Sequence, residues 1–402
     1  MTQTTQTTPT PVRPARYGPA VLALAMGGFA IGTTEFMAMG LLPQVADGVG
    51  VSIPSAGHLI SAYALGVVVG APVLAFFGAR LPRRGLLVAL MTAYAVANAL
   101  SALAGSYGLL LASRFLCGVP HGAFFGVASL VAASLAPRGR EGRAVATVMI
   151  GLSVANVLGV PVATWLGQTV GWRAAFWVAA GLALVTAALV IAFLPSCPGN
   201  AEATGRRELG LFAEPQAWLT LIAGAIGFGG MFALYSYIAE VVTEVGGLGE
   251  GAVPVFLLAF GLGMVAGTWV AGSLADWSVF RSLLGSSLAM ALLLLLYAAL
   301  APAGWWALVP AFLVAVASSV LVVNLQLRLM SVAGDAQTLG AAMNHSSLNI
   351  GNALGAWLGG LVIAAGFGYR APALVGVLLA MAGLGVLVLS AHVARRTSVA
   401  VG

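Results

Sequence analysis

Long apolar segments separated by short polar breaks are the feature that most constrains the fold of this 402-residue chain. A bilayer core is spanned by about 20 mostly apolar helical residues, and twelve segments of roughly that length or longer can be marked. They cover residues 19–42, 54–77, 85–104, 107–135, 142–169, 173–195, 216–240, 252–274, 281–301, 304–330, 338–366 and 370–392. The sequence therefore predicts an all-α integral membrane protein with twelve transmembrane helices.

The scarcity of charge excludes several classes of soluble protein. Charged residues make up 7% of the chain, whereas soluble domains carry about 25%. So few charges cannot cover a soluble surface, which excludes a soluble enzyme, a nucleic-acid-binding module and a disordered protein. The sequence shows no clustered metal ligands, no phosphate-binding loop and no nucleophile beside a plausible base. We therefore expect no metal, no cofactor and no enzymatic activity.

The positions of the basic residues predict the orientation, because loops rich in Arg and Lys stay in the cytoplasm. All 17 are Arg, and 14 of them fall in the tails and loops of one side. Arg173 and Arg370 fall on the other side, and Arg114 lies inside a span. The abundance of Ala, Gly, Val and Arg favours a GC-rich bacterial source, and we expect a multi-pass protein of its plasma (inner) membrane with both termini in the cytoplasm. The net charge of +6 then faces anionic lipid and does not indicate a nucleic-acid partner.

One polar break, at residues 196–215, divides the spans into two groups of six. Ala155–Gly159 in span five resembles Gly351–Gly355 in span eleven, which indicates an internal repeat unless two Gly/Ala-rich helices match by chance. Repeated halves with a midplane site between them are typical of secondary transporters. The expected parts are a cytoplasmic tail at 1–18, six-helix bundles at 19–195 and 216–392, a cytoplasmic linker at 196–215 and a cytoplasmic tail at 393–402.

Four short motifs in register with these spans resemble the major facilitator superfamily. They are GGFAIGTTEFMAMG in span one, GARLPRRGLL after span two, RFLCGVPHG from Arg114 in span four and GLSVANVLGVP in span five. The resemblance covers essentially the whole chain and is closest to bacterial drug:proton antiporters of the arabinose-efflux and chloramphenicol-resistance-like branch.

That resemblance implies two pseudo-symmetric six-helix bundles and the proton-coupled efflux of a small organic molecule by alternating access. The substrate would be a drug, such as a chloramphenicol-like antibiotic, or a sugar-like metabolite. We expect a monomer in the lipid bilayer whose other partners are the small-molecule substrate and protons. A solute importer or facilitator of the same fold and a non-transporting membrane sensor are the alternatives.

The loop motif departs from the family pattern at Pro82, where relatives usually have Asp. In relatives that Asp belongs to a charge pair that latches the inner gate. The equivalent loop of the second half keeps an acid, Asp276, with Arg281 nearby. The resemblance therefore implies gating roles for Arg83, Arg84 and Asp276.

Glu35 and Arg114 are an acid and a base well inside the predicted spans, where charges are costly and usually functional. Each lies 7 residues from the outer end of its span, which at about 1.5 Å per residue is roughly 10 Å deep. Glu35 is our candidate proton-coupling carboxylate and Arg114 its electrostatic partner; a static ion pair or a Glu reaching the outer interface is the alternative. His121 lies nearly on the face of Arg114 and is either a proton relay or a packing histidine.

Five residues are candidates for the substrate cavity. His345, Asn349 and Asn352 form a polar stripe on span eleven, and Asn156 has the repeat-related position in span five. Such stripes either line a wet path or hydrogen-bond neighbouring helices. Tyr235 is a candidate for an aromatic cavity wall, or else an interfacial aromatic.

Small residues at four-residue spacing predict close helix packing in spans four, five and eleven. Gly159 and Gly355 belong to these stripes, and Pro161 should bend span five because it lacks a backbone donor. We expect spans five and eleven to act as sliding surfaces between the halves, with simple packing as the alternative.

Overall fold

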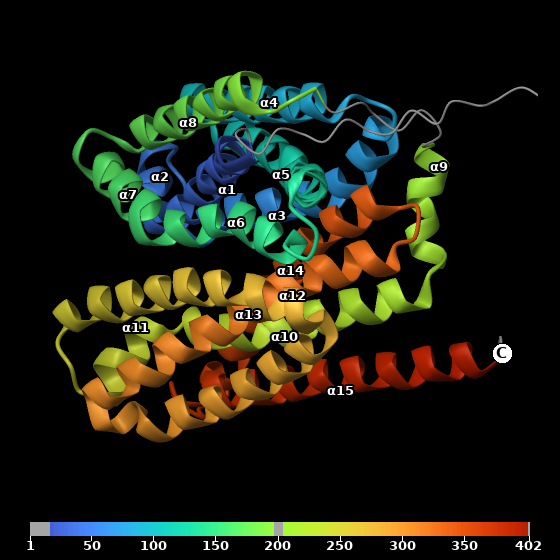
Figure 1. Cartoon of the computed structure of the whole chain (residues 1–402). Helices are drawn as coiled ribbons and strands as arrows, with labels where there is room; N and C mark the ends of the chain where they lie inside the picture. The colour runs from blue at the N-terminus through green and yellow to red at the C-terminus, as the bar shows by residue number, and fades with distance from the viewer. Residues whose placement is uncertain (1–16, 197–203, 401–402) are drawn as a thin grey trace, which may run out of the picture.

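The computed structural model describes residues 17–196 and 204–400, and within these ranges the chain is almost entirely helical (Figure 1). The first helices are α1 (Tyr17–Gly40), α2 (Leu42–Gly48), α3 (Ile53–Gly78), α4 (Arg83–Leu103), α5 (Tyr107–Leu135), α6 (Glu141–Val154), α7 (Val160–Thr169) and α8 (Trp172–Phe193). After the linker helix α9 (Gly205–Glu208) come α10 (Pro215–Tyr235), α11 (Ile238–Glu240), α12 (Val253–Leu300), α13 (Leu308–Val332), α14 (Gln337–Ala364) and α15 (Ala371–Ala400). Most of the expected N-terminal tail, Cys197 and the last two residues lie outside the described residues.

The number of membrane passes depends on a sharp reversal inside α12. Ten described segments are long and apolar enough to cross a membrane, and one of them, Val253–Val332, contains 80 residues. Ser278 has extended backbone angles, and the Ser282 hydroxyl donates to the Leu274 carbonyl at 3.0 Å. Eight residues of straight helix would separate these groups by about 12 Å, so the chain folds back at Ser278. This long segment therefore makes three passes, and the predicted all-α fold with twelve transmembrane helices is confirmed.

Local sequence sets several helix starts. Ser106 accepts a hydrogen bond from the Leu109 amide and so caps α5. Gly171 has a φ of 125°, which side chains disfavour, and lets the chain turn into α8. Short connections of this kind make consecutive helices antiparallel neighbours.

The helices form two layers, α1–α8 and α10–α15, each with its own apolar core (Figure 1). Tyr94 and Phe124 are fully buried in the first core, and Tyr297 and Leu294 in the second. Large apolar side chains also face outward, and Trp269 is 74% exposed. Such a surface suits lipid and not water.

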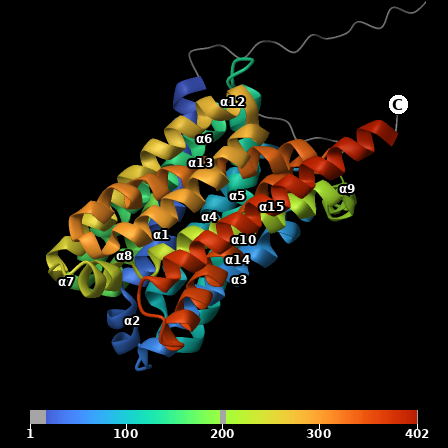
Figure 2. The same cartoon turned by 90° about the horizontal axis from the view of Figure 1, so that it is seen from below.

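The two halves pack closely at one end of the molecule. The end that carries α9 and the last turns of α15 is called here the linker end, and the opposite end, with α2 and α7, the far end (Figures 1 and 2). At the linker end, Ala75 of α3, Leu211 of the linker and Leu339 of α14 belong to one buried cluster. A second cluster joins Val145 of α6 to Ala271 of α12. Apolar contacts therefore close the linker end.

The glycines of spans five and eleven make the close helix contacts that their spacing predicts, and these contacts lie within each half. A methyl group on Gly159 would lie 2.1 Å from Thr33 of α1, and one on Gly355 would lie 2.1 Å from the Gly229 carbonyl of α10. Both glycines therefore pack within their own half, although α6 and α14 do contact the other half. The glycines that approach α14 from the first half are Gly122 and Gly126 of α5.

The helix of span five is irregular just before Pro161, where we expect a bend. The turn before it, Ala155–Gly159, is a π-helical segment between α6 and α7. Such segments widen a helix by one residue and are common at functional sites. Here the segment places Asn156 on the inner side of the first half.

Candidate functional site

A cavity of about 790 Å³, counting space open to solvent, lies between the two halves. Eight Phe and Met side chains lie in its wall: Phe36, Phe125, Met149, Phe228, Met231, Phe232, Phe260 and Met264. Phe and Met side chains can pack around an apolar ligand of irregular shape. Ten polar side chains also line the cavity, among them Ser318 and Ser319.

All five substrate-cavity candidates lie in this wall, and so does Glu35. They are Asn156, Tyr235, His345, Asn349 and Asn352. The amides of Asn156 and Asn349 each donate to the carbonyl four residues earlier, so part of their capacity is used within the helix. Sequence reasoning pointed to Phe125 among the possible wall aromatics but not to the other Phe and Met residues, because these residue types are equally common on lipid-facing surfaces.

One hydrogen bond across the cavity was also missed. Ser153 of α6 and Thr268 of α12 lie 2.9 Å apart between their hydroxyl oxygens, and both line the cavity. Single Ser and Thr residues are frequent in membrane helices, so no sequence pattern marked this pair. It fixes the spacing of the two halves at the cavity wall.

Glu35 and Arg114 do not form an ion pair in this structure. Glu35 is 9% exposed and faces the cavity, whereas Arg114 is 1% exposed and lies behind the wall. The Arg114 guanidinium lies over the ring of Tyr63, 4.6 Å from its centre, and 5.6 Å from that of Phe176. Its nitrogens make no hydrogen bond of ordinary geometry within the described part of the chain. Cation–π contacts therefore hold Arg114 here, which leaves its hydrogen-bonding capacity open.

His121 takes part in a hydrogen-bonded chain that crosses from one half to the other. Tyr63 Oη lies 2.8 Å from His121 Nδ1, and His121 Nε2 lies 3.0 Å from Nδ1 of His345. The Tyr94 hydroxyl extends the chain, 3.2 Å from that of Tyr63. The ring of Phe125 stacks on His345, with centres 4.1 Å apart.

Two opposite proton arrangements satisfy the histidine bonds of this chain. If Tyr63 donates to Nδ1 of His121, the neutral His121 carries its proton on Nε2 and donates to Nδ1 of His345. His345 then carries its proton on Nε2, which is buried and has no partner among the described residues. In the reverse arrangement Tyr94 donates to the Ile31 carbonyl, each hydrogen bond along the chain runs the other way, and Nε2 of His345 is an acceptor. Since His345 lines the cavity, the chain ends in either case in a nitrogen available to a molecule bound there.

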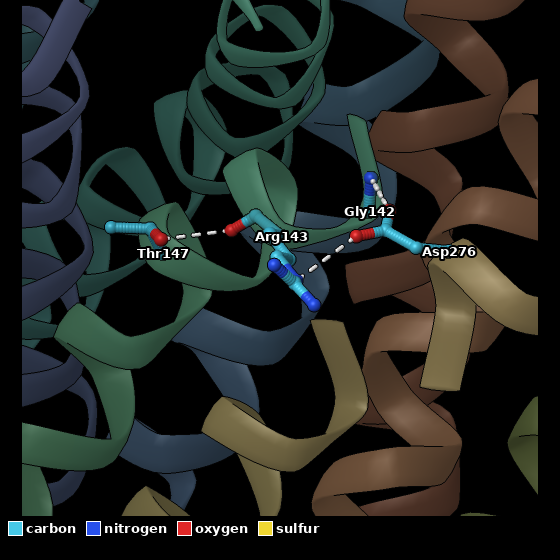
Figure 3. Close-up of polar contacts among 4 residues, drawn as sticks. All are labelled: Gly142, Arg143, Thr147 and Asp276. Carbon is cyan, nitrogen blue, oxygen red and sulfur yellow. Dashed lines mark hydrogen bonds and ion pairs between the residues drawn. The ribbon is translucent and has the colours of Figure 1, made fainter. Parts of the chain in front are cut away.

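An ion pair and a helix cap join the halves at the linker end (Figure 3). Asp276 accepts a hydrogen bond from the Gly142 amide at 2.9 Å and pairs with Arg143 at 3.3 Å. Gly142 lies in the first turn of α6, whose capping residue, Arg140, supplies no side-chain acceptor. The partner of Asp276 is thus Arg143 and not Arg281, whose guanidinium lies over Trp277.

The side chains of Arg83 and Arg84 have different surroundings, although the two residues are neighbours in sequence. Arg84 donates to the Ile191 carbonyl at the end of α8, so it acts within the first half. Arg83 lines a second, polar cavity at the linker end together with Glu208, Asp335 and Thr338. Sequence reasoning did not mark Glu208, because it stands in a linker where an acid is normally solvated.

The chain matches known proteins along most of its length. The profile of the Major Facilitator Superfamily matches residues 24–344. The chain belongs to this family. The inner membrane transport protein YdhP of Escherichia coli K12 is 43% identical over 364 residues, covering 90% of this chain and 92% of that protein. The chloramphenicol resistance protein of Streptomyces lividans is 37% identical over 341 residues, covering 83% and 86%.

Solved structures of the family support the fold. The E. coli fucose:proton symporter FucP, in the outward conformation, is 16% identical with a TM-score of 0.74, over 93% of this chain and 99% of that one. The chain therefore has the Major Facilitator fold, and this member of the family is a membrane transporter. Among the described residues, no three His, Cys, Asp or Glu side chains are placed to hold a metal ion.

Proposed function

We propose that this transporter exports a small, largely apolar organic molecule in exchange for protons. The observation that carries the proposal is Glu35, a carboxylate at membrane depth in the wall of the same apolar cavity that would hold the substrate. Burial of a charge there is costly unless it is neutralised or paired. Proton uptake and substrate occupancy therefore compete for one space.

The proposed orientation puts the linker end and both termini in the cytoplasm, with the halves at 19–195 and 216–392. In this orientation the closed linker end separates the cavity from the cytoplasm. In this state Glu35 has no ion pair and takes up a proton from outside. When the cavity opens to the cytoplasm, approach of Glu35 to Arg114 would favour the carboxylate and release that proton inward.

The cavity also indicates the substrate chemistry. Phe and Met side chains suit an aromatic or apolar body, and the unpartnered Nε2 of His345 suits one hydrogen-bonding group on it. A chloramphenicol-like molecule has this character, and the name of the Streptomyces relative supports testing that compound first. A sugar-like metabolite is the alternative substrate, because hydroxyl and amide side chains such as Ser318, Ser319 and Asn352 also line the cavity and suit its hydroxyl groups.

Transport into inverted membrane vesicles tests the proposal. With an acid interior, we expect the wild-type protein to accumulate labelled chloramphenicol, or another drug found in a susceptibility panel. Glu35→Gln should abolish accumulation driven by the gradient while exchange of labelled for unlabelled drug continues. Glu244→Gln, which changes an exposed acid at the far end, is the matched control. Gradient-driven accumulation by Glu35→Gln would refute the coupling role, and drug uptake in the opposite direction would favour the importer.

A further inference from the structure

The linker carboxylate Glu208 is buried between the two halves. It is 4% exposed, although it lies in a short helix outside the membrane spans. Its Oε2 atom accepts a hydrogen bond of 2.9 Å from the Leu339 amide, in the first turn of α14. A buried carboxylate in a linker is unusual, because such groups are almost always solvated.

Helix α14 needs this acceptor. Its capping residue is Ala336, which has no side-chain oxygen, so the first-turn amides lack a local partner. Glu208 supplies one from 131 residues away and places a negative charge at the positive end of the helix. The arrangement repeats what Asp276 does for Gly142 in α6.

The linker holds Glu208 on the first half while its carboxylate reaches the second. Helix α9 packs mainly on the end of α3, where Gly205 lies directly against Phe76. The Glu208–Leu339 bond therefore joins the halves. Separation of α3 from α14 at the linker end must break it or pull the linker away from α3.

The internal repeat explains why the linker provides this acid. Asp276 lies 194 residues after Pro82, in the matching loop of the other half. By symmetry with the Asp276–Gly142 bond, position 82 would supply the acceptor for α14, but proline has none. Pro82 instead begins α4 without any side-chain cap.

We propose that Glu208 is the second latch of the linker end and takes the place of the acid missing at position 82. Asp276 holds α6 from the second half, and Glu208 holds α14 from the linker on the first. Both bonds must break before the cavity opens at this end. The inference rests on the alternating access of the proposed function, but not on the substrate or on proton coupling.

Spin-label distances test the latch without substrate or gradient. Labels on cysteines at Arg138 and Ser331, in a background with both native cysteines replaced by serine, report the separation of the halves at the linker end. Both positions are exposed. Because a hydrogen bond to a charged group is lost, we expect Glu208→Ala to raise the ratio of open to closed molecules about tenfold or more. Glu208→Gln, which keeps an acceptor oxygen, should remain mostly closed.

Two further variants make the result specific. Glu214→Ala removes an exposed carboxylate from the same linker and should leave the distances unchanged. Adding Pro82→Asp to Glu208→Ala should restore the closed population, because it places an acid where the repeat predicts one. Wild-type distances in Glu208→Ala, or equal opening in Glu214→Ala, would overturn the proposal. Either result would overturn the latch but not the proposed drug efflux. Conversely, gradient-driven accumulation by Glu35→Gln would overturn the proposed proton coupling but not the latch.

Discussion

His121 of α5 and His345 of α14 share a hydrogen bond of 3.0 Å across the boundary between the two halves. The pair lies between the central cavity, which His345 lines, and the closed linker end. It therefore forms part of the barrier that separates the cavity from the linker end. Any movement that opens this barrier must separate the two rings.

Loss of the histidine bond should favour the open linker end. A net contribution of about 1 kcal/mol for one buried hydrogen bond corresponds to roughly a fivefold change in the equilibrium. We expect His345→Leu to produce a shift of that size in the spin-label distances described above. His121→Leu should do the same, and the double variant should add little, since both single changes remove one shared bond.

The matched control for this pair is His392→Leu. His392 is exposed on α15 and bonds only within its own helix, to the Val388 carbonyl. The His392→Leu substitution should leave the spin-label distances at the linker end unchanged. Fully additive effects of His121→Leu and His345→Leu would contradict a direct bond between them.

Close contact between α14 and α10 predicts a stability effect at Gly355. A methyl group there would lie 2.1 Å from the Gly229 carbonyl, which is backbone and cannot move aside. We expect Gly355→Ala to lower the free energy of unfolding in detergent by about 1–3 kcal/mol through overpacking. Gly285→Ala meets nothing within 4 Å and should raise it by about 0.5–1 kcal/mol. Equal effects of the two changes would argue against the contact.

The sequence was sufficient for the fold because each span is a local signal. Length, apolar composition and the placement of Arg are read segment by segment, and the family motifs then supply the arrangement. What could not be predicted was the face that each small residue presents. Gly159 and Gly122 look alike in sequence, yet one packs on α1 and the other on α14. That difference depends on helix rotation, which a periodic stripe does not determine.

The site was predictable in part for a similar reason. Glu35, His345 and Asn156 stand out because polar groups are rare in apolar segments. The pairing of His345 with His121 joins residues 224 apart and follows only from the packing of α14 on α5. Glu208 was missed because its burial depends on two helices that the linker contacts and on the cap that α14 lacks.

The two functions of Asp276 can be separated by substitution. Asp276→Asn keeps an acceptor for the Gly142 amide but loses the charge that pairs with Arg143, whose side chain is 53% exposed. An exposed pair contributes at most about 1 kcal/mol, so we expect a small effect. Asp276→Ala also removes the cap of α6, which contributes about 0.5–2 kcal/mol more.

Thiol labelling measures this difference. A cysteine at Asn156, in the cavity wall, becomes reachable from the linker end only when that end opens. A membrane-impermeant reagent added from that side should label it faster in Asp276→Ala than in Asp276→Asn. Asn156→Cys alone gives the baseline rate. The reverse order would show that the ion pair, and not the cap, holds α6.

Burial of Glu208 gives the linker end a predictable response to pH. Burial raises the pKa of its carboxyl above the ordinary value of 4.5, although the Leu339 amide, Thr338 and Arg83 act in the opposite direction. If opening exposes the group to water, its pKa falls back toward 4.5, so the closed form binds the proton more tightly. By linkage, lowering the pH through the range above 4.5 should increase the closed population. Spin-label distances at a series of pH values should show this in the wild-type protein.

Other groups also respond to pH. The prediction therefore concerns the difference in pH response between a variant that lacks the Glu208 carboxyl and one that keeps it. Arg83 from α4 and Asp335 before α14 line the same cavity. Glu208→Gln should lose the acid-induced closing, whereas Asp335→Asn should retain it. A wild-type pH response in Glu208→Gln would assign the effect to other groups, such as Glu35 or the histidine pair. Closing on alkalinisation would contradict the raised pKa itself.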